Sequence, residues 1–522
     1  MRTTQIVIAL CLLVVLGVPF AMSGVKRGNI HSEGAVRLIA VTPHVPQIRD
    51  EFARAFAVWH EREYGQVAVI DFRTPGGTSE IRKQLSAMFT DAVKRFVKDA
   101  DGFEYEAGNG IELPAGSIAF DVMFGGGSYD HAMLSDGKSI PVVTKGGVAM
   151  VVEVSQSVPM DFSQAELDEI FGENKIGPQE LYDPEQYWIG TALSSFGIVY
   201  NRDVYADRLE MPFPEQFVDL TLHELGGWIA LADPRQSGSI TTTFDSILGN
   251  EGWTQGWRIL RGLSGNTRYF TNSSTKPPID VSNGEAAAGL AIDFYGRGQA
   301  QVIQDSGGGN RVGYVEPEGA VYVDADPISI INGGPNPELA RRFVRFCLSE
   351  EGQALWQFAK DNPDNPIGVD GEPMGPEWNE LRRMPVRRVM YEKYFPYFMD
   401  QVNPFEIVSD VKNPGWRKGV QVMMGSFGID IAQDCREAYG ALGKAKASGK
   451  FSDEEIAELD GLYFAFPETE IDGVMVPFTE ETYRAVRNEW RKDGREVRLK
   501  IAYTRFYREN YQEIVRRVGE RL

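Results

Sequence analysis

The stretch Ala230–Thr243, ALADPRQSGSITTT, decides the fold of this chain. The apolar residues Trp228–Ala232 predict the end of a buried strand, which Asp233-Pro234 interrupts. Ser237-Gly238-Ser239 then predicts the start of a helix that runs from Ile240 to Leu248. Such a helix points free backbone N–H groups and its positive dipole end at the edge where open α/β sheets bind ligands. A plain turn with an N-terminal cap is the alternative for this stretch taken alone.

The same arrangement recurs earlier in the chain. Predicted strands at Val67–Phe72 and Ile118–Phe124 end at the loops Thr74–Ser79 and Gly125–Ser128, and a helical pattern follows each loop. A first strand, Val36–Val41, leads into Thr42-Pro43-His44 and another helix. Repeated strand–loop–helix units predict an α/β protein whose loops line one common edge.

Two apolar strands, near 147–154 and 320–331, bracket a middle segment with its own strands and helices. This pattern predicts two α/β lobes, with the chain crossing between them twice. The first lobe is expected at 36–146 and 325–362, and the second lobe, inserted in it, at 147–324. After a loop rich in Pro, Gly and Asn, residues 381–522 predict a mostly helical C-terminal extension.

Residues 1–23 are typical of a secretory signal peptide. Arg2 precedes an apolar run that reaches Phe20, and Ala21-Met22-Ser23 offers small residues for cleavage. The run is shorter than a comfortable membrane span of about 20 residues, and an uncleaved anchor is the alternative. We therefore expect a periplasmic or extracytoplasmic protein.

The composition excludes some partners. The chain has 53 basic and 74 acidic residues and a formal charge of -21, which argues against nucleic acid or an anionic membrane surface as the main partner. Beyond the predicted signal peptide only Cys347 and Cys435 remain, too few for a disulfide framework. Both lie in helical patterns and are expected to be buried free thiols.

Several motifs resemble the extracellular solute-binding proteins of ABC importers, and within that superfamily the ferric-iron-type binding proteins are the most similar. The resemblance covers about residues 36–360. The matching motifs are Phe196–Asn201, Ala232-Asp233-Pro234 with Ser237–Ser239, Asn283–Ala287, Pro317-Glu318-Gly319, Asp326-Pro327-Ile328, Asn336–Ala340 and Ser349–Gln353.

The resemblance implies a type II periplasmic-binding-protein fold, two α/β lobes that close on a solute in the cleft between them. It also implies a small-molecule or ion ligand and delivery to an ABC permease in the inner membrane with a separate ATPase. The chain has no Gly-x-x-x-x-Gly-Lys-Ser/Thr loop and is therefore not expected to be that ATPase. We expect a monomer without catalytic activity, without a nucleic-acid partner and without a bound cofactor.

The predicted ligand-binding residues follow the strands and open the helices. Turn chemistry is the alternative for the glycine and serine loops, a strand bulge for the two serines of the middle strand, and a buried hydrogen-bonded pair for Asp293 and Tyr295, which are expected on one face of a strand. The predicted set comprises Thr42, His44, Gly76, Gly77, Thr78, Ser79, Gly125, Gly126, Gly127, Ser194, Ser195, Ser237, Gly238, Ser239, Asp293 and Tyr295.

The pattern departs from the ferric binders at their metal site. That family uses adjacent tyrosines, whereas Asp293-Phe294-Tyr295 offers one. If Fe(III) is the transported ligand, His44, Glu80 and Tyr295 are the expected ligands. The histidines show no His-x-x-x-His spacing that would favour a separate zinc site.

Two other functions remain open at this point: an enzyme on the same two-lobed scaffold, and a sensory input module. An enzyme needs a positioned nucleophile or base, and the sequence has no Gly-x-Ser-x-Gly elbow. A basic segment, Arg382-Arg383 and Arg387-Arg388, favours a solvated face with internal salt bridges, with contact to an anionic partner as the alternative.

Overall fold

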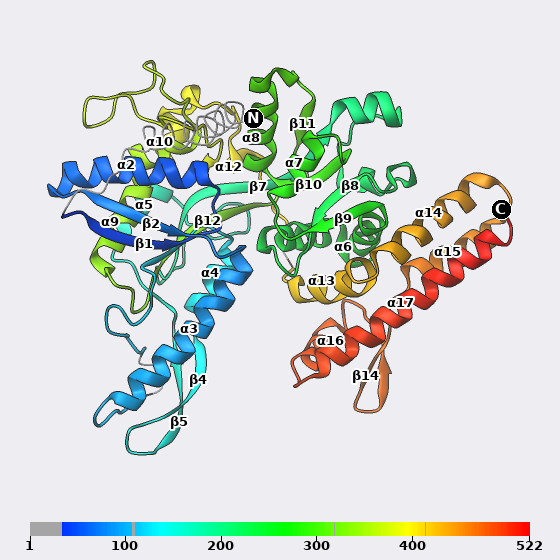
Figure 1. The fold of residues 1–522 in the computed structure, drawn as a ribbon, viewed down its shortest axis with the longest axis horizontal. Helices are drawn as coiled ribbons and strands as arrows, with labels where there is room; N and C mark the ends of the chain where they lie inside the picture. The colour runs from blue at the N-terminus through cyan, green and yellow to red at the C-terminus, as the bar shows by residue number, and fades with distance from the viewer. Residues whose placement is uncertain (1–33, 107–109, 318, 413) are drawn as a thin grey trace, which may run out of the picture.

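The computed structural model describes residues 34–106, 110–317, 319–412 and 414–522 (Figure 1). The predicted signal peptide or anchor, residues 1–23, lies outside the described residues. Within the described part of the chain, no helix is both long and apolar enough to cross a membrane.

A single twisted sheet runs through both lobes, with its central strands in the order β2-β1-β3-β12-β7-β10-β8-β9. In the first lobe β1, β2 and β3 are parallel and β12 is antiparallel to β3; in the second lobe β10, β8 and β9 are parallel. These strands are β1 (Val36–Val41), β2 (Ala68–Arg73), β3 (Val122–Phe124), β7 (Ile189–Asn201), β8 (Ile229–Ala232), β9 (Thr267–Thr271), β10 (Ala288–Ile292) and β12 (Val323–Ile331), with β6 (Ser157–Val158) and β11 (Val312–Val315) at the side.

Two strands carry the chain between the lobes. The first half of β7 pairs with β12, up to Ser195 opposite Val323, and its second half pairs with β10, from Phe196 opposite Ile292. The predicted double crossover is therefore formed by β7 and β12, side by side. β7 runs continuously for 13 residues, through Ser194 and Ser195.

The boundary expected at residues 146 and 147 is wrong. The apolar segment before Val154 is one half of a hairpin, β4 (Lys138–Val143) with β5 (Ala149–Val154), which projects from the first lobe beside α3 (Figure 1). Leu167, Phe171 and Ile189 pack into the first lobe's core with Phe52 and Phe343. The second lobe therefore begins inside β7, because the segment between β5 and β7 covers the first lobe.

The helices of the two lobes flank the sheet. Those of the first lobe are α2 (Pro46–Tyr64), α3 (Thr78–Asp99), α4 (Ser128–Ser135), α5 (Gln164–Phe171), α9 (Pro337–Leu348) and α10 (Glu350–Gln357). Those of the second are α6 (Gly238–Asn266), α7 (Lys276–Ser282) and α8 (Asp293–Ile303), with short helices η1 (Val204–Leu209), η2 (Phe217–Thr221), η3 (His223–Leu225) and η4 (Gln304–Gly308).

The helix that opens at Ser237 is much longer than predicted. The Ser237 side chain accepts a hydrogen bond from the Ile240 backbone N–H and caps α6, as the sequence suggested. Gly252, with a φ of 74°, bends the helix, and a second helical stretch follows. The region after β10 also differs: Asp293 begins α8, so Asp293 and Tyr295 lie in a first helical turn and not on one strand face.

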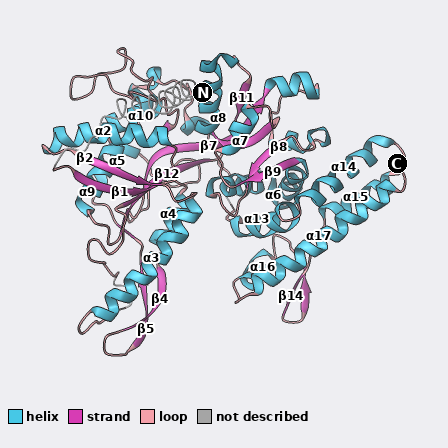
Figure 2. Ribbon diagram, in the orientation of Figure 1, coloured by secondary structure: helices cyan, strands magenta, loops and turns pink. Residues whose placement is uncertain are grey.

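The extension beyond residue 381 is mostly helical, as predicted (Figure 2). It starts on the first lobe, where β13 pairs with β7, and ends against the second lobe. Its elements are β13 (Met384–Pro385), α11 (Val389–Lys393), η5 (Phe395–Tyr397), α12 (Pro404–Ile407), α13 (Arg417–Met424), η6 (Gly425–Ile429), α14 (Ala432–Ser448), α15 (Asp453–Phe464), β14 (Thr469–Ile471), β15 (Val474–Val476), α16 (Tyr483–Trp490) and α17 (Arg495–Gly519).

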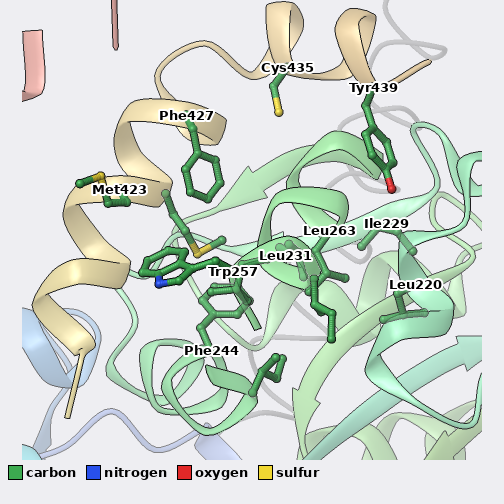
Figure 3. Packing of buried hydrophobic residues seen from close by; sticks show 14 of the residues in the cluster. Leu220, Ile229, Leu231, Phe244, Trp257, Leu263, Met423, Phe427, Cys435 and Tyr439 are labelled. Atoms are coloured by element: carbon green, nitrogen blue, oxygen red, sulfur yellow. The ribbon is translucent and has the colours of Figure 1, made fainter. Parts of the chain in front are cut away.

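The extension and the second lobe share one hydrophobic core. Trp257 of α6 lies close to Phe427 and Met423 of the extension (Figure 3). The Trp257 and Phe427 ring centroids are 6.3 Å apart. Each fully buried side chain of this size contributes about 1.5–3 kcal/mol to stability. Cys435 and Cys347 are buried free thiols, as expected.

Candidate functional site

A cavity of about 420 Å³ lies between the lobes, at the carboxyl edge of the strands. Its volume lies within the usual range for small-molecule sites, about 300–1,000 Å³. The first lobe lines it with the loops after β1 and β2 and the glycine loop before α4, and the second lobe with the loops around the start of α6 and after β9.

Most residues proposed from the sequence lie at this cavity. The structure brings together there His44, Gly76, Gly77, Thr78, Glu80, Gly126, Gly127, Ser194, Ser237, Gly238, Ser239 and Tyr295.

Five proposed residues do not line the cavity. The Thr42 hydroxyl accepts a hydrogen bond from the His44 backbone N–H, 3.1 Å away, and Ser79 is buried in α3. Gly125 lies against the His44 ring. Ser195 donates to Glu316, and Asp293 accepts from Arg297 at 3.2 Å. These residues position their neighbours and do not face the cavity.

The starts of α3 and α6 face the cavity from opposite lobes. Gly77 precedes α3 and Ser237 caps α6, and both residues line the cavity. The first N–H groups of a helix have no partner within the helix, and they carry the positive end of its dipole. Two such ends around one cavity favour a negatively charged group between them.

Hydroxyl groups surround the start of α6. Ser237 Oγ lies 3.2 Å from Ser239 Oγ, which lies 3.1 Å from Ser274 Oγ. Ser273 Oγ is 2.9 Å from Thr275 Oγ1. The loop Asn272–Thr275 also lines the cavity, although it is not among the residues predicted from the sequence. Like the predicted loops, it is a polar loop that follows a strand, but unlike them it contains no glycine.

A buried ion pair forms part of the cavity wall. Asp326 pairs with Arg383, accepts a hydrogen bond from the Gly126 backbone N–H at 2.7 Å, and lies 3.5 Å from His44 Nε2. Arg383 also donates to Ser194 Oγ. Only 3% of Arg383 is exposed. For Arg383 the solvated face expected from the sequence is therefore wrong.

The other three arginines of that segment make different contacts from one another. Arg382 pairs with Asp400 at 2.5 Å and Arg387 with Glu169 at 2.5 Å, which are internal salt bridges of the expected kind. Arg388 lies over the Phe405 ring. Only Arg383 of the four lines the cavity.

Burial sets the charge state of several groups at the site. It lowers the pKa of His44 well below its ordinary value, and Arg383 adds to the effect, so His44 is neutral at pH 7. It raises the pKa of Asp324 to about 6, although Ser128 donates hydrogen bonds to that carboxylate. It raises the pKa of Tyr295 to about 12, which disfavours a phenolate.

Among the described residues, no cluster of three or more His, Cys, Asp or Glu side chains is placed to hold a metal ion. The Fe(III) set of His44, Glu80 and Tyr295 stays a prediction. His44, the member with the best-defined contacts, faces Arg383 Nη1 at 3.0 Å, and a guanidinium this close disfavours a cation on the same nitrogen.

The lobes meet at the mouth of the cavity. A Cβ atom at Gly77 would lie 2.9 Å from the Gln236 carbonyl oxygen, and one at Gly238 would lie 2.7 Å from Asp130 Oδ2. Arg417 of the extension lies over the Tyr129 ring, 4.3 Å from its centroid. Residues from both lobes therefore approach each other closely around the cavity.

Comparison with known proteins supports the resemblance seen in the sequence. Residues 156–383 match the family model of bacterial extracellular solute-binding proteins. The phosphoglycerate transport regulatory protein PgtC of Salmonella typhimurium is 27% identical over 184 residues, 35% of this chain and 44% of that protein. The chain thus spans less than half the length of the curated relatives it matches. The predicted resemblance is confirmed.

Solved structures of periplasmic binding proteins are also similar. Iron-bound HitA from Pseudomonas aeruginosa is 15% identical and covers 74% of this chain and 98% of its own, with a TM-score of 0.47. AfuA from Actinobacillus pleuropneumoniae, with fructose-6-phosphate bound, is 18% identical and covers 61% of this chain and 81% of its own, with a TM-score of 0.44. The fold of this chain is the predicted one, two lobes joined by a double crossover with a helical extension.

Proposed function

We propose that this chain, which matches bacterial extracellular solute-binding proteins over residues 156–383, is the periplasmic solute-binding protein of an ABC importer. Its interlobe cavity captures a small solute that carries a phosphate or carboxylate group. It hands the solute to an inner-membrane permease with a separate ATPase and performs no chemistry itself. The second candidate is a sensory module, because a curated relative is named a transport regulatory protein.

One observation is the main support for an anionic solute: the starts of α3 and α6, from opposite lobes, line the same cavity. An anion between them accepts hydrogen bonds from backbone N–H groups that have no helical partner. It also bridges the lobes, so its binding free energy favours the closed form.

Neighbouring groups support the same ligand. The hydroxyls of Ser237, Ser239 and Ser274 form a connected row beside the start of α6. Arg417 donates to the Gly238 carbonyl at 3.0 Å, which places a cation directly behind that helix start. Hydroxyl donors and a nearby guanidinium are the groups that phosphate and carboxylate oxygens prefer.

Phosphorylated three-carbon acids are the first solutes to test, because a curated relative is named for phosphoglycerate transport. Isothermal calorimetry and thermal unfolding would compare 2- and 3-phosphoglycerate, inorganic phosphate, fructose-6-phosphate, and Fe(III) with carbonate. A true ligand at 100 times its Kd stabilises the protein by about 2.7 kcal/mol.

The variant Ser237→Ala with Ser239→Ala tests the site. Loss of hydroxyl hydrogen bonds to a charged group costs about 1.5–3 kcal/mol, so we expect at least about a tenfold weaker Kd. Ser306→Ala, which removes an exposed hydroxyl bonded to the Val302 carbonyl, is the matched control. An unchanged Kd in the double variant would contradict the assignment of this cavity.

A further inference from the structure

One wall of the interlobe cavity is apolar. The cavity is lined there by Phe196 of β7, Ile292 at the end of β10, and Phe294 and Tyr295 in the first turn of α8. All four pack in one hydrophobic cluster, which continues into the core of the first lobe. We call these four residues the apolar wall. The starts of α3 and α6 and the loop Asn272–Thr275 form the polar part of the same cavity.

The strand pairing and the first turn of α8 bring the apolar wall together. Phe196 lies directly opposite Ile292 in the antiparallel pair of β7 and β10, so both side chains point to the same face of the sheet. The ring centroids of Phe294 and Tyr295 are 4.1 Å apart. Tyr295 is only partly buried and lines the cavity, so its ring is accessible to a solute there.

The polar groups beside the apolar wall are already bonded to one another. Arg383 lies over the Phe294 ring, 4.2 Å from its centroid, and pairs with Asp326. It also donates to Ser194 Oγ at 2.6 Å. The hydroxyls of a sugar or polyol need hydrogen-bond partners when they are buried, because an unpaired polar group is unfavourable. An aromatic ring needs none, so this part of the cavity favours a ring over a polyol.

The size of the cavity fits a solute with two different parts. A cavity of about 150 Å³ is enough to hold benzene, and this one measures about 420 Å³. A phosphate or carboxylate between the helix starts therefore leaves room for a ring. Without such a group, the apolar wall would face water and its burial would contribute nothing to binding.

We propose that the solute of the interlobe cavity is an aromatic oxyanion, a phosphate or carboxylate attached to an aromatic ring. The oxyanion lies between the starts of α3 and α6, and the ring packs against the apolar wall. This inference rests on the proposed function, an anionic solute in this cavity. It adds the chemical class of the rest of the solute, which the helix starts alone do not determine.

Two matched pairs of probes test for the ring by calorimetry on the full chain: phenyl phosphate with methyl phosphate, and phenylacetate with acetate. The members of a pair carry the same oxyanion and differ in the ring. Burying a phenyl group should tighten the Kd about 10- to 150-fold within a pair. A preference for the ring in one pair only identifies the oxyanion as phosphate or as carboxylate. Fructose-6-phosphate, a polyol phosphate, should bind more weakly than phenyl phosphate.

Variants of Tyr295 place the ring in the cavity. Tyr295→Ser removes one side of the apolar wall and should reduce the preference for phenyl phosphate over methyl phosphate about 3- to 10-fold. Tyr295→Phe keeps the ring and should keep most of this preference. Tyr397→Ser is the matched control, because Tyr397 is 45% exposed in η5 and does not line the cavity.

The outcomes separate this inference from the proposed function. If methyl phosphate, acetate or 3-phosphoglycerate binds and the ring compounds bind no more tightly than their partners, the inference is wrong and the proposed function stands. If no oxyanion of the series binds, both are wrong. Tighter binding of fructose-6-phosphate than of phenyl phosphate, or an unchanged preference in Tyr295→Ser, would also overturn the inference. If Tyr295→Ser fails to fold, the probes on the unchanged chain still decide the result.

Discussion

Glu80 distinguishes an anionic solute from Fe(III) in the interlobe cavity. It lies in the first turn of α3, is exposed and lines the cavity. Its carboxylate folds back over the loop before the helix, with Oε2 2.0 Å from the point where a Cβ atom at Gly76 would lie. It therefore places a negative charge where the start of α3 meets the solute. An anion is repelled by this carboxylate, whereas Fe(III) would bind it.

The size of the effect follows from the exposure of Glu80. For charges about 5 Å apart in a water-like medium, the interaction is about 0.8 kcal/mol per pair of unit charges. Glu80→Gln should therefore tighten a monoanion about 4-fold and a dianion about 10- to 20-fold at low salt. The gain should shrink at about 0.5 M salt, because exposed charges are screened.

Calorimetry at low and high salt measures this change, with phosphate and 3-phosphoglycerate as the solutes. The matched control is Glu454→Gln, an exposed acid in the first turn of α15 that does not line the cavity. Both variants should lose about 0.3–1 kcal/mol of helix stability, so only the Kd separates them. If Glu80→Gln weakens anion binding, or abolishes Fe(III) binding while no anion binds, the anionic assignment is refuted.

Three further predictions concern the hinge, the extension and the closed form. Arg383→Met should destabilise the protein by about 3–5 kcal/mol, because it leaves buried Asp326 unpaired; adding Asp326→Asn should restore much of this in urea denaturation. Burial raises the pKa of Asp245 to about 7, against about 3.9 unfolded, so the native state keeps a proton that the unfolded state releases. The contribution of Asp245 to the free energy of unfolding should therefore fall as the pH rises from about 4 to about 7. In urea denaturation, Asp245→Asn should remove this dependence of stability on pH. An unchanged pH dependence in the variant would contradict the prediction. Gly238→Ala should hinder lobe closure, because its Cβ would lie 2.7 Å from Asp130 Oδ2; small-angle scattering should then show a larger radius of gyration and calorimetry a weaker Kd than in Gly440→Ala, whose Cβ meets nothing within 4 Å.

The loops of the interlobe cavity were predictable because their signals are local. A strand that ends at Gly or Ser before a helix is visible in a few consecutive residues, as at Gly76–Thr78 and Ser237–Ser239. The capping role of Ser237 follows from the same short pattern and is present in the structure. The same local patterns predicted helices after the loops Thr74–Ser79 and Gly125–Ser128, where the structure has α3 and α4.

The predictions that are wrong concern residues whose structure depends on contacts with distant parts of the chain. Arg383 lies in a basic, polar segment, yet β13 pairs with β7 and carries this arginine against Asp326, more than 50 residues earlier in the chain. The alternation Ala291, Asp293, Tyr295 predicts a strand, but β10 ends at Ile292 and the chain turns into α8. The apolar pattern of β5 predicts a strand that crosses between the lobes, but β5 pairs with its neighbour β4 in a hairpin.

The extension connects the two lobes a third time, and this bears on how closure works. Its first part fixes Arg383 beside Asp326 and Ser194, where β7 and β12 cross. Its later part fixes Arg417 to Gly238 at the start of α6. Because hinge closure moves one lobe against the other, the segment between these two arginines must follow the motion or resist it. The same residue, Arg417, also lies over the Tyr129 ring of the first lobe, 4.3 Å from its centroid. The extension therefore contacts both lobes beside the cavity, so any movement of one lobe against the other must change these contacts or strain the segment between them.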